Sequence, residues 1–261
     1  METMRYNETK KSSKGPIIAL LLFVLVGGGI IFWAINSEQE PVVIGETKSD
    51  VQRLIDTESS EEIIQKNSAI SYEVKEKKSS DTSNKKIKSN ITVPEIYIAG
   101  AALTEKNTEI EKKYTDLFVG LKSQMSSATN SFTYTVSYNS YDNMVGVDKI
   151  LSLTLYQRVT DDAAKKNTTE KIETYNIDLA TKKDVSQEVV ALEILGKDYK
   201  TKIQDTVKKY VVSKKMISES SFSYTITGLE NYYVKDSKFH IVFNEGELVD
   251  KKYSVLDITI E

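Results

Sequence analysis

The chain has 261 residues, of which 28% are charged and 39% hydrophobic, and its formal net charge is −3. It contains no cysteine and one histidine, which excludes disulfide scaffolds, zinc ribbons, thiol nucleophiles and two-histidine metal sites. The weakly acidic balance gives no basic footprint, so we expect no nucleic-acid partner. The composition therefore disfavours most enzyme classes and does not by itself indicate a function.

Residues 16–35 carry the strongest pattern in the chain, twenty positions without one charged side chain. A helix of that length spans about 30 Å, the thickness of the hydrocarbon core of a bilayer. We therefore expect a transmembrane helix over 16–35. A cleaved signal peptide is the alternative, but the residues before Asn36 do not form the small-residue cleavage site of such peptides.

The flanks of this segment predict its orientation. Arg5, Lys10, Lys11 and Lys14 precede it, whereas residues 36–40 are polar or acidic. The positive-inside rule then makes residues 1–15 a short cytoplasmic tail. We expect a polar stalk over 36–68 and an extracytoplasmic domain over 69–261. The expected localisation is the cell membrane, as a single-pass protein that contacts the lipid bilayer through one helix.

The part expected outside the membrane, residues 36–261, has a net charge near −5. Such a charge favours encounter with a basic partner, although physiological salt screens the attraction beyond about 8 Å. Solubility is the simpler explanation of the same charge.

Alternating apolar residues predict the first strands of the domain. Ile70, Tyr72 and Val74 alternate, and the Lys-, Ser- and Asn-rich run 75–86 is typical of a loop or hairpin connection. Residues 87–98 form a second extended run, in which Pro94 indicates a sheet edge or a strand end.

Helical spacing follows, because apolar residues recur every three or four positions from Ile110 to Met125, and Thr104 can cap the N-terminus. The period then returns to two, with one expected core face formed by Phe132, Tyr134, Val136 and Tyr138. Residues 150–159 and 171–179 predict the next two strands, joined by the polar run 160–170, which could line the same end of the sheet as the C-terminal loop.

A second helical region begins near Ser186, with a short helix ending at Gly196 and a lysine-rich helix opened by Asp198. Strands are expected again at 222–226, 232–234, 239–243 and 253–260, with Asp236-Ser237-Lys238 as a hairpin signal. This order indicates an α+β fold: antiparallel sheets packed with two helical regions, preceded by a single transmembrane helix and a polar stalk.

Six segments, taken in order along the chain, match the pattern of a known family. They are Ile70-Ser-Tyr-Glu-Val, Glu111-Lys-Lys-Tyr114, Tyr175-Asn-Ile-Asp-Leu179, the helix 200–215, Lys238-Phe-His-Ile-Val-Phe-Asn-Glu245 and the final Ile258-Thr-Ile. In this order they resemble the extracytoplasmic domain of RsiV-type proteins, over about residues 70–261. The resemblance implies a lysozyme-binding receptor domain without chemistry of its own. In that family the domain belongs to an anti-sigma factor, and lysozyme binding triggers membrane proteolysis that releases the sigma factor.

Two departures from the family pattern change the expectation. The tail 1–15 is too short to hold a sigma factor, so we expect a receptor half without a sigma-factor partner. In the last loop, Gly246 stands where the family tends to have tyrosine, Asp250, Lys251 and Lys252 replace Pro-Gly-Tyr, and Ser254 replaces a glycine. Since that loop touches lysozyme in the receptor, its divergence bears directly on the ligand.

The residues that we expect to contact a partner flank this loop. They are Tyr232, Tyr233, Asp250, Lys251, Lys252 and Tyr253. Tyrosine buries a large ring while keeping a polar tip, which suits an interface anchor. We expect no catalytic residue, cofactor or metal. His240 fits a strand histidine better than a catalytic base, and Asp178 fits a brace for the following turn better than a metal ligand.

The sequence thus favours a non-enzymatic, membrane-anchored extracytoplasmic binding protein that sequesters or senses lysozyme at the cell surface. The alternative is a structural or assembly component of the bacterial cell envelope that binds another protein or peptidoglycan. A third interpretation, an accessory domain of an envelope enzyme, would require a fused catalytic domain.

Overall fold

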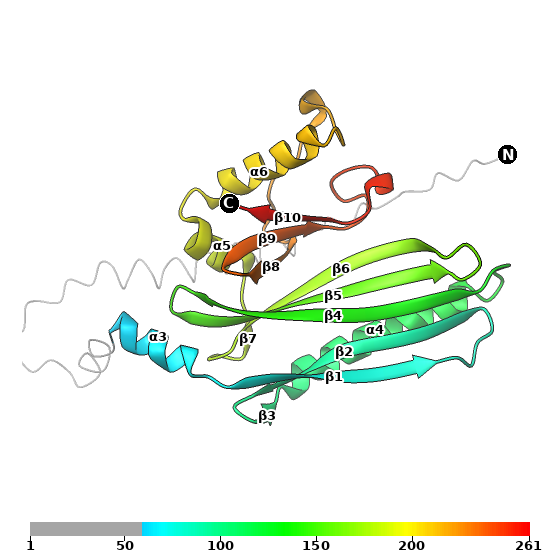
Figure 1. Cartoon of the computed structure of the whole chain (residues 1–261), viewed down its shortest axis with the longest axis horizontal. Helices are drawn as coiled ribbons and strands as arrows, with labels where there is room; N and C mark the ends of the chain where they lie inside the picture. The colour runs from blue at the N-terminus through cyan, green and yellow to red at the C-terminus, as the bar shows by residue number, and fades with distance from the viewer. Residues whose placement is uncertain (1–58) are drawn as a thin grey trace, which may run out of the picture. The chain divides into compact units, whose positions relative to one another are not determined.

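The structure, a computed structural model, describes residues 59–261 (Figure 1). The expected cytoplasmic tail, the expected transmembrane helix 16–35 and most of the expected stalk lie outside the described residues. Among residues 59–261, no helix is both long enough and apolar enough to cross a bilayer.

The larger of two sheets has seven strands in the order β1-β2-β4-β5-β6-β7, with the short β3 paired to β2. These strands are β1 (Tyr72–Asp81), β2 (Ile87–Ile98), β3 (Ala101–Ala102), β4 (Phe132–Val145), β5 (Asp148–Asp161), β6 (Lys166–Asp178) and β7 (Lys183–Asp184). The run 87–98 that the sequence marks as extended is β2 in full.

One pair in this sheet is parallel, which corrects the expectation of purely antiparallel sheets. Ile87–Ile91 of β2 pair in parallel with Phe132–Val136 of β4. The connection between them contains helix α4 (Thr104–Gln124), because parallel neighbours need a crossover. The α+β class is observed, with a mixed sheet.

Pro94 lies where β2 has only one neighbouring strand. It pairs with Glu76 of β1, and the parallel partner β4 extends only to Ile91. Asn107 of α4 completes this side of β2: its amide donates to the Ile96 carbonyl (3.0 Å) and accepts from the Ile96 backbone amide (2.8 Å). The expectation that Pro94 marks an edge is therefore confirmed on that side.

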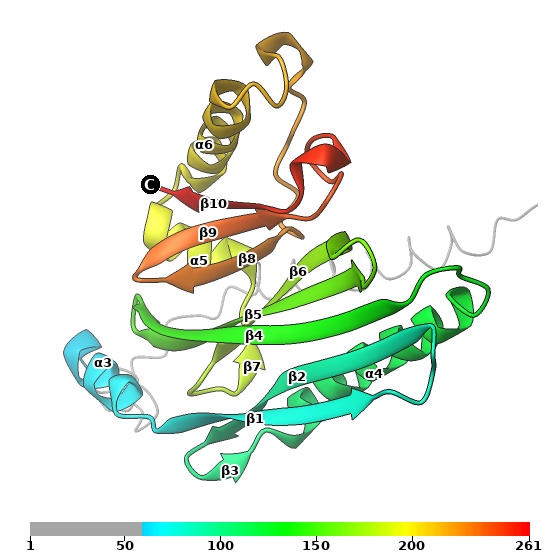
Figure 2. The ribbon, with the colours of Figure 1, turned by 45° about the vertical axis from the view of Figure 1, so that its right-hand side comes forward.

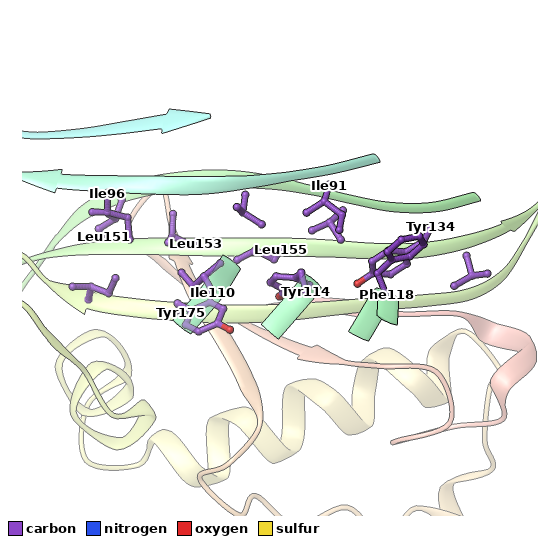
Figure 3. Packing of buried hydrophobic residues seen from close by; sticks show 14 of the residues in the cluster. Ile91, Ile96, Ile110, Tyr114, Phe118, Tyr134, Leu151, Leu153, Leu155 and Tyr175 are labelled. Carbon is purple, nitrogen blue, oxygen red and sulfur yellow. The ribbon is translucent and has the colours of Figure 1, made fainter. Parts of the chain in front are cut away.

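Helix α4 covers one face of the large sheet and forms the first core with it (Figure 3). Its buried residues are Ile110, Tyr114 and Phe118, spaced four apart along one face. Phe118 stacks on Tyr134 of β4 at 6.0 Å between ring centroids, which confirms the expected core face of that strand. Leu103, not Thr104, occupies the N-cap position, and no side chain caps this end.

The second sheet has three antiparallel strands in the order β10-β9-β8 (Figure 2). They are β8 (Asn231–Lys235), β9 (Lys238–Phe243) and β10 (Leu256–Ile260). Asp236 and Ser237 connect β8 to β9 with positive φ angles of 52° and 59°, as a two-residue primed turn requires. The hairpin expected here is confirmed.

Two helices cover one face of this small sheet. They are α5 (Gln187–Leu195), capped by the Ser186 hydroxyl and ended by Gly196, and α6 (Tyr199–Ser213). Ile203, Val207 and Val211 of α6 are fully buried in a second core with the sheet. The sequence predicted both helices. A single 3₁₀ turn, η1 (Glu219–Ser221), follows α6.

The other edge of β8 meets the face of the large sheet instead of another strand. Ser152 of β5 accepts a hydrogen bond from the Val234 backbone amide at 3.0 Å. The amides of Asn176 and Asn143 donate to the carbonyls of Tyr232 (2.7 Å) and Val234 (3.0 Å). Buried polar side chains of one sheet therefore satisfy the backbone edge of the other, and we call this contact the polar seam.

Four local expectations are wrong. Residues 75–81 continue strand β1, because they pair in register with β2. Strands β5 and β6 extend into the run 160–170, where their polar residues pair across the hairpin with a register shift between Val159 and Thr160. Residues 222–226 alternate between partly buried and exposed but pair with no strand among the described residues. Tyr253 lies in a 3₁₀ turn, η2 (Lys251–Tyr253), before β10.

A helix occupies the end of the stretch expected as a stalk. This helix, α3 (Ser60–Ser68), begins with a capping box in which Ser59 and Glu62 bond to each other's backbone amides. Near its end Asn67 donates to the Val147 carbonyl at 2.8 Å. Residues 60–68 therefore contact the turn between β4 and β5.

Candidate functional site

Tyr232 is part of the second core. Its side chain is 7% exposed, its ring stacks on Phe239 at 5.4 Å, and its hydroxyl donates to the Val185 carbonyl at 2.5 Å. Burial raises the pKa of Tyr232 to well above its usual value. The ring is therefore not available as a surface anchor in this conformation.

Tyr233, on the opposite face of β8, is equally inaccessible at 4% exposure. Its ring lies between Tyr141 (5.5 Å) and His240 (4.5 Å), and its hydroxyl donates to Asp257 at 2.6 Å. Burial, reinforced by that carboxylate, raises the pKa of Tyr233. Neighbours along a strand face opposite ways, and both faces are covered here because α5 and α6 pack on one and the large sheet on the other.

The other four expected contact residues lie together, three in the turn η2 and Asp250 at its N-cap position. Asp250 accepts a hydrogen bond from the Lys252 backbone amide at 3.0 Å and so fixes the turn. Tyr253 is half-buried, with the Lys252 ammonium 4.9 Å from its ring centroid and its hydroxyl 3.4 Å from the Lys215 carbonyl. Lys251 and Lys252 are exposed. These residues, unlike Tyr232 and Tyr233, are on the surface.

The turn η2 forms one wall of an open cleft of about 650 Å³, whose other wall is the tip of the β5–β6 hairpin. Nine residues line it: Lys165, Lys166, Asn167, Thr168, Glu170, Glu245, Lys251, Lys252 and Ser254. Two segments about 80 residues apart in the chain thus build one site, which we call the lysine cleft. The sequence suggested that the run 160–170 lines the same end of the sheet as the C-terminal loop, and the cleft has this arrangement.

Glu170 ties the two walls together. Its carboxylate accepts hydrogen bonds from Arg158 Nε (2.9 Å), Asn167 Nδ2 (2.8 Å) and Ser254 Oγ (2.8 Å). Arg158 compensates its charge, and the two neutral donors satisfy further acceptor sites, so Glu170 contributes structure more than free negative charge to the cleft. The hairpin tip itself is shaped by Asp161, whose carboxylate accepts from the backbone amides of Ala163 and Ala164.

Ser254 holds an unusual backbone conformation at the edge of the cleft, with φ 57° and ψ −160°. That region is populated almost only by glycine, and a side chain there costs about 1–3 kcal/mol. The hydrogen bond from its hydroxyl to Glu170 is the evident compensation. The glycine expected at this position from the family resemblance fits the same geometry without strain.

The four lysines of the cleft have no carboxylate partner among the described residues. Lys165, Lys166, Lys251 and Lys252 are all exposed and make no ion pair. Elsewhere in residues 59–261, many lysines are paired, such as Lys77 with Glu111 and Lys122 with Asp81. The cleft therefore concentrates uncompensated positive charge in a domain whose charges nearly cancel: residues 59–261 have a net charge near −1.

Sequence reasoning singled out Lys251 and Lys252 but not Lys165 and Lys166. The available signal was the Lys165-Lys166 pair at the centre of a polar run between two strands, where a hairpin tip is expected. Lys165 also adopts a positive φ of 51°, which places it at the turn itself. Only contacts between distant segments, such as the hydrogen bond from Ser254 to Glu170, show that this tip meets the C-terminal loop.

The remaining singled-out residues have local partners. His240 lies on β9 with 13% of its side chain exposed, 3.2 Å from Asp257 Oδ1 and stacked on Tyr233. Asp178 braces the following turn as expected, accepting from the Ala180 backbone amide (2.8 Å) and the Thr181 hydroxyl (2.7 Å). Within residues 59–261, no group of three or more acidic or histidine side chains is placed to hold a metal ion.

Comparison with known proteins gives likenesses of fold only. No family model matches the sequence, and no curated protein matches it. A solved structure from Bacteroides fragilis, described as a member of the DUF3298 family, is similar with a TM-score of 0.41 and 14% identity over 74% of this chain and 90% of that chain. A DUF3298 family protein from Pseudomonas aeruginosa gives a TM-score of 0.48 and 10% identity over 74% and 91%.

Proposed function

We propose that this protein is a non-catalytic binding protein of the bacterial cell envelope, and that its ligand binds in the lysine cleft. The domain is held outside the cytoplasm by the apolar segment 16–35 and presents the cleft to the envelope. This proposal keeps the receptor-like character that the sequence favours. Of the expected contact residues it keeps Lys251 and Lys252, and it replaces the buried Tyr232 and Tyr233 with the tip of the β5–β6 hairpin.

The lysine cleft is the observation that carries the proposal. It joins two loops on a rigid frame of paired strands, and binding sites are commonly built on loops that a scaffold positions. Its four lysines are exposed and uncompensated, so a ligand of opposite charge can displace water and counterions there. Tyr232 and Tyr233, by contrast, are buried inside the domain.

The binding experiment uses cell walls stripped of membrane lipid, so that anchoring in lipid cannot mimic binding. The purified full-length chain is mixed with the walls at micromolar concentration and sedimented. We expect saturable co-sedimentation with a dissociation constant in the micromolar range, equivalent to about −8 kcal/mol. Recovery of all the protein in the supernatant would contradict the proposal.

The topology is tested separately. A reporter that works only outside the cytoplasm, fused after Glu261, should be active, and the same reporter at the N-terminus should be inactive. Activity in the reverse arrangement would place the lysine cleft inside the cell and remove the envelope as its surroundings.

Lysozyme is the second candidate ligand, and one observation favours it. Most of the net charge of −5 in residues 36–261 comes from 36–58, which have a net charge near −4. A basic protein would be attracted to that segment, whereas the lysine cleft would repel it. We expect immobilised c-type lysozyme to capture the full-length chain through residues 36–58. Neutralising Glu38, Glu40 and Glu46 to Gln should then weaken capture, and capture that is unchanged would exclude this electrostatic route.

A further inference from the structure

We propose that the ligand of the lysine cleft is an anionic polymer of phosphodiester-linked polyols. This inference rests on the proposed function and names the chemical class that the cleft selects. It follows from three features of the site: the number of free positive charges, the side chains that carry them, and the absence of aromatic side chains among the nine lining residues.

The charge of the cleft selects an anion. Four lysines face two glutamates, and Glu170 is already bonded to Arg158, Asn167 and Ser254. The remaining carboxylate, Glu245, cannot offset four ammonium groups. Lys252 is held near the Tyr253 ring, 4.9 Å from its centroid, and this fixes one of the charges beside the cleft.

The residue type favours phosphate over a protein surface. Lysine acts as a compact point charge with rotatable donors, which suits a chain of phosphates in variable conformations, whereas bidentate recognition of a carboxylate prefers arginine. Protein interfaces take most of their affinity from buried tryptophan, tyrosine and arginine. The lining of this cleft offers none of these.

The shape of the cleft agrees with a polymer. It is open and about 650 Å³ in volume, and its two walls are contributed by a hairpin tip and a short turn, so a chain can enter and leave at its ends. The uncharged polar residues Asn167 and Thr168 provide hydrogen-bond partners for polyol hydroxyl groups. A repeating ligand would therefore place successive phosphates near the paired lysines on each wall.

The test measures binding of the full-length chain to synthetic poly(glycerol phosphate) by fluorescence titration at several salt concentrations. Counterion release predicts a slope of log K against log[salt] of about −0.7 for each phosphate contact, hence roughly −3 for four lysines. The variant with Lys165, Lys166, Lys251 and Lys252 replaced by Gln should bind at least tenfold more weakly at low salt and show a slope near zero.

A matched variant controls for net charge. Lys85, Lys88, Lys183 and Lys197 are also exposed and make no ion pair within residues 59–261, and replacing these four by Gln changes the charge equally. Its affinity and salt slope should stay close to those of the unchanged protein. Equal losses in both variants would overturn the assignment, because they would show attraction to the whole protein and not to the cleft.

Three further outcomes separate this inference from the proposed function. If the chain binds lipid-free walls but poly(glycerol phosphate) does not compete, the phosphodiester class is wrong while the binding function stands. Poly-glutamate of the same charge that competes more strongly than the phosphate polymer would indicate an acidic protein partner and would also overturn the inference. Failure to bind walls at all would remove the proposed function itself.

Discussion

The side-chain amide of Asn176 donates a hydrogen bond to the Tyr232 carbonyl at 2.7 Å, and this bond joins the face of the large sheet to the edge of strand β8. Edge strands expose unpaired backbone groups and tend to attract other strands. In this protein the free edge of β8 is hydrogen-bonded by three buried side chains of the large sheet, those of Asn176, Ser152 and Asn143. The polar seam therefore orients the small sheet, and with it the C-terminal loop that forms one wall of the lysine cleft.

Ser152 is the residue of the seam whose replacement is most informative. Its hydroxyl donates to Asn176 Oδ1 (2.6 Å) and accepts from the Val234 amide, and the side chain is fully buried. Ser152→Ala leaves two buried polar groups without a partner, so we expect unfolding to become easier by about 1–3 kcal/mol in urea titrations.

Ser137→Ala is the matched control for this change. Ser137 is exposed on the neighbouring strand β4, so its replacement should alter stability by less than about 0.5 kcal/mol. Equal effects of the two substitutions would mean that the seam does not stabilise the contact between the sheets.

Ser254 gives a prediction about backbone strain. Ala and Gly both lack the hydroxyl that bonds Glu170, so comparing them isolates the cost of a side chain at φ 57°, ψ −160°. We expect Ser254→Gly to be about 1–3 kcal/mol more stable than Ser254→Ala in thermal or urea unfolding. At ordinary extended positions Ala is the more stable of the two. If Ser254→Ala is instead more stable than Ser254→Gly, the backbone conformation at position 254 is not strained.

Asp148 gives a prediction about pH. Burial, followed by the nearby carboxylates of Asp178 and Glu193, raises the pKa of Asp148 above its ordinary value of 3.8. The folded protein therefore holds this proton more tightly than the unfolded chain does. Stability falls as pH rises through the interval between the two pKa values, so the ionised carboxylate destabilises the protein at pH 7.

Asp148→Asn should consequently stabilise the protein at pH 7 and lose this advantage below about pH 3.8, where both states are protonated. Urea unfolding at pH 7 and pH 3 measures the difference. Asp205→Asn, exposed on α6, changes the net charge equally and should show no comparable gain at pH 7. A destabilising Asp148→Asn at pH 7 would mean that its hydrogen bonding outweighs the repulsion.

Local patterns predicted much of the fold, because they depend on neighbours in sequence. The run 87–98, the start of α5 near Ser186 and the Asp236-Ser237 turn each follow from residue type and period. The parallel pairing of β2 with β4 does not, since it is set by how α4 returns the chain across the sheet. Residues 222–226 show the same limit: their alternation is real, but no strand within residues 59–261 pairs with them.

The candidate site was predictable only in part, because local patterns do not show which distant segments meet. Alternation along 232–234 indicates that Tyr232 and Tyr233 face opposite sides, but only the tertiary structure buries both, between helices on one side and the large sheet on the other. Lys251 and Lys252 were found through the divergent loop. Their meeting with Lys165 and Lys166 depends on contacts between distant segments, such as the hydrogen bond from Ser254 to Glu170.

The central claim, that the ligand occupies the lysine cleft, is tested most directly by blocking the cleft. The chain has no cysteine, so Asn167→Cys creates a unique attachment point for a bulky maleimide in the cleft, and Lys112→Cys creates one on the exposed face of α4. Binding of each labelled full-length protein to lipid-free cell walls is compared with that of its unlabelled form. The account predicts at least a tenfold loss for the label at position 167 and no loss at position 112. Equal wall binding by both labelled proteins would contradict it.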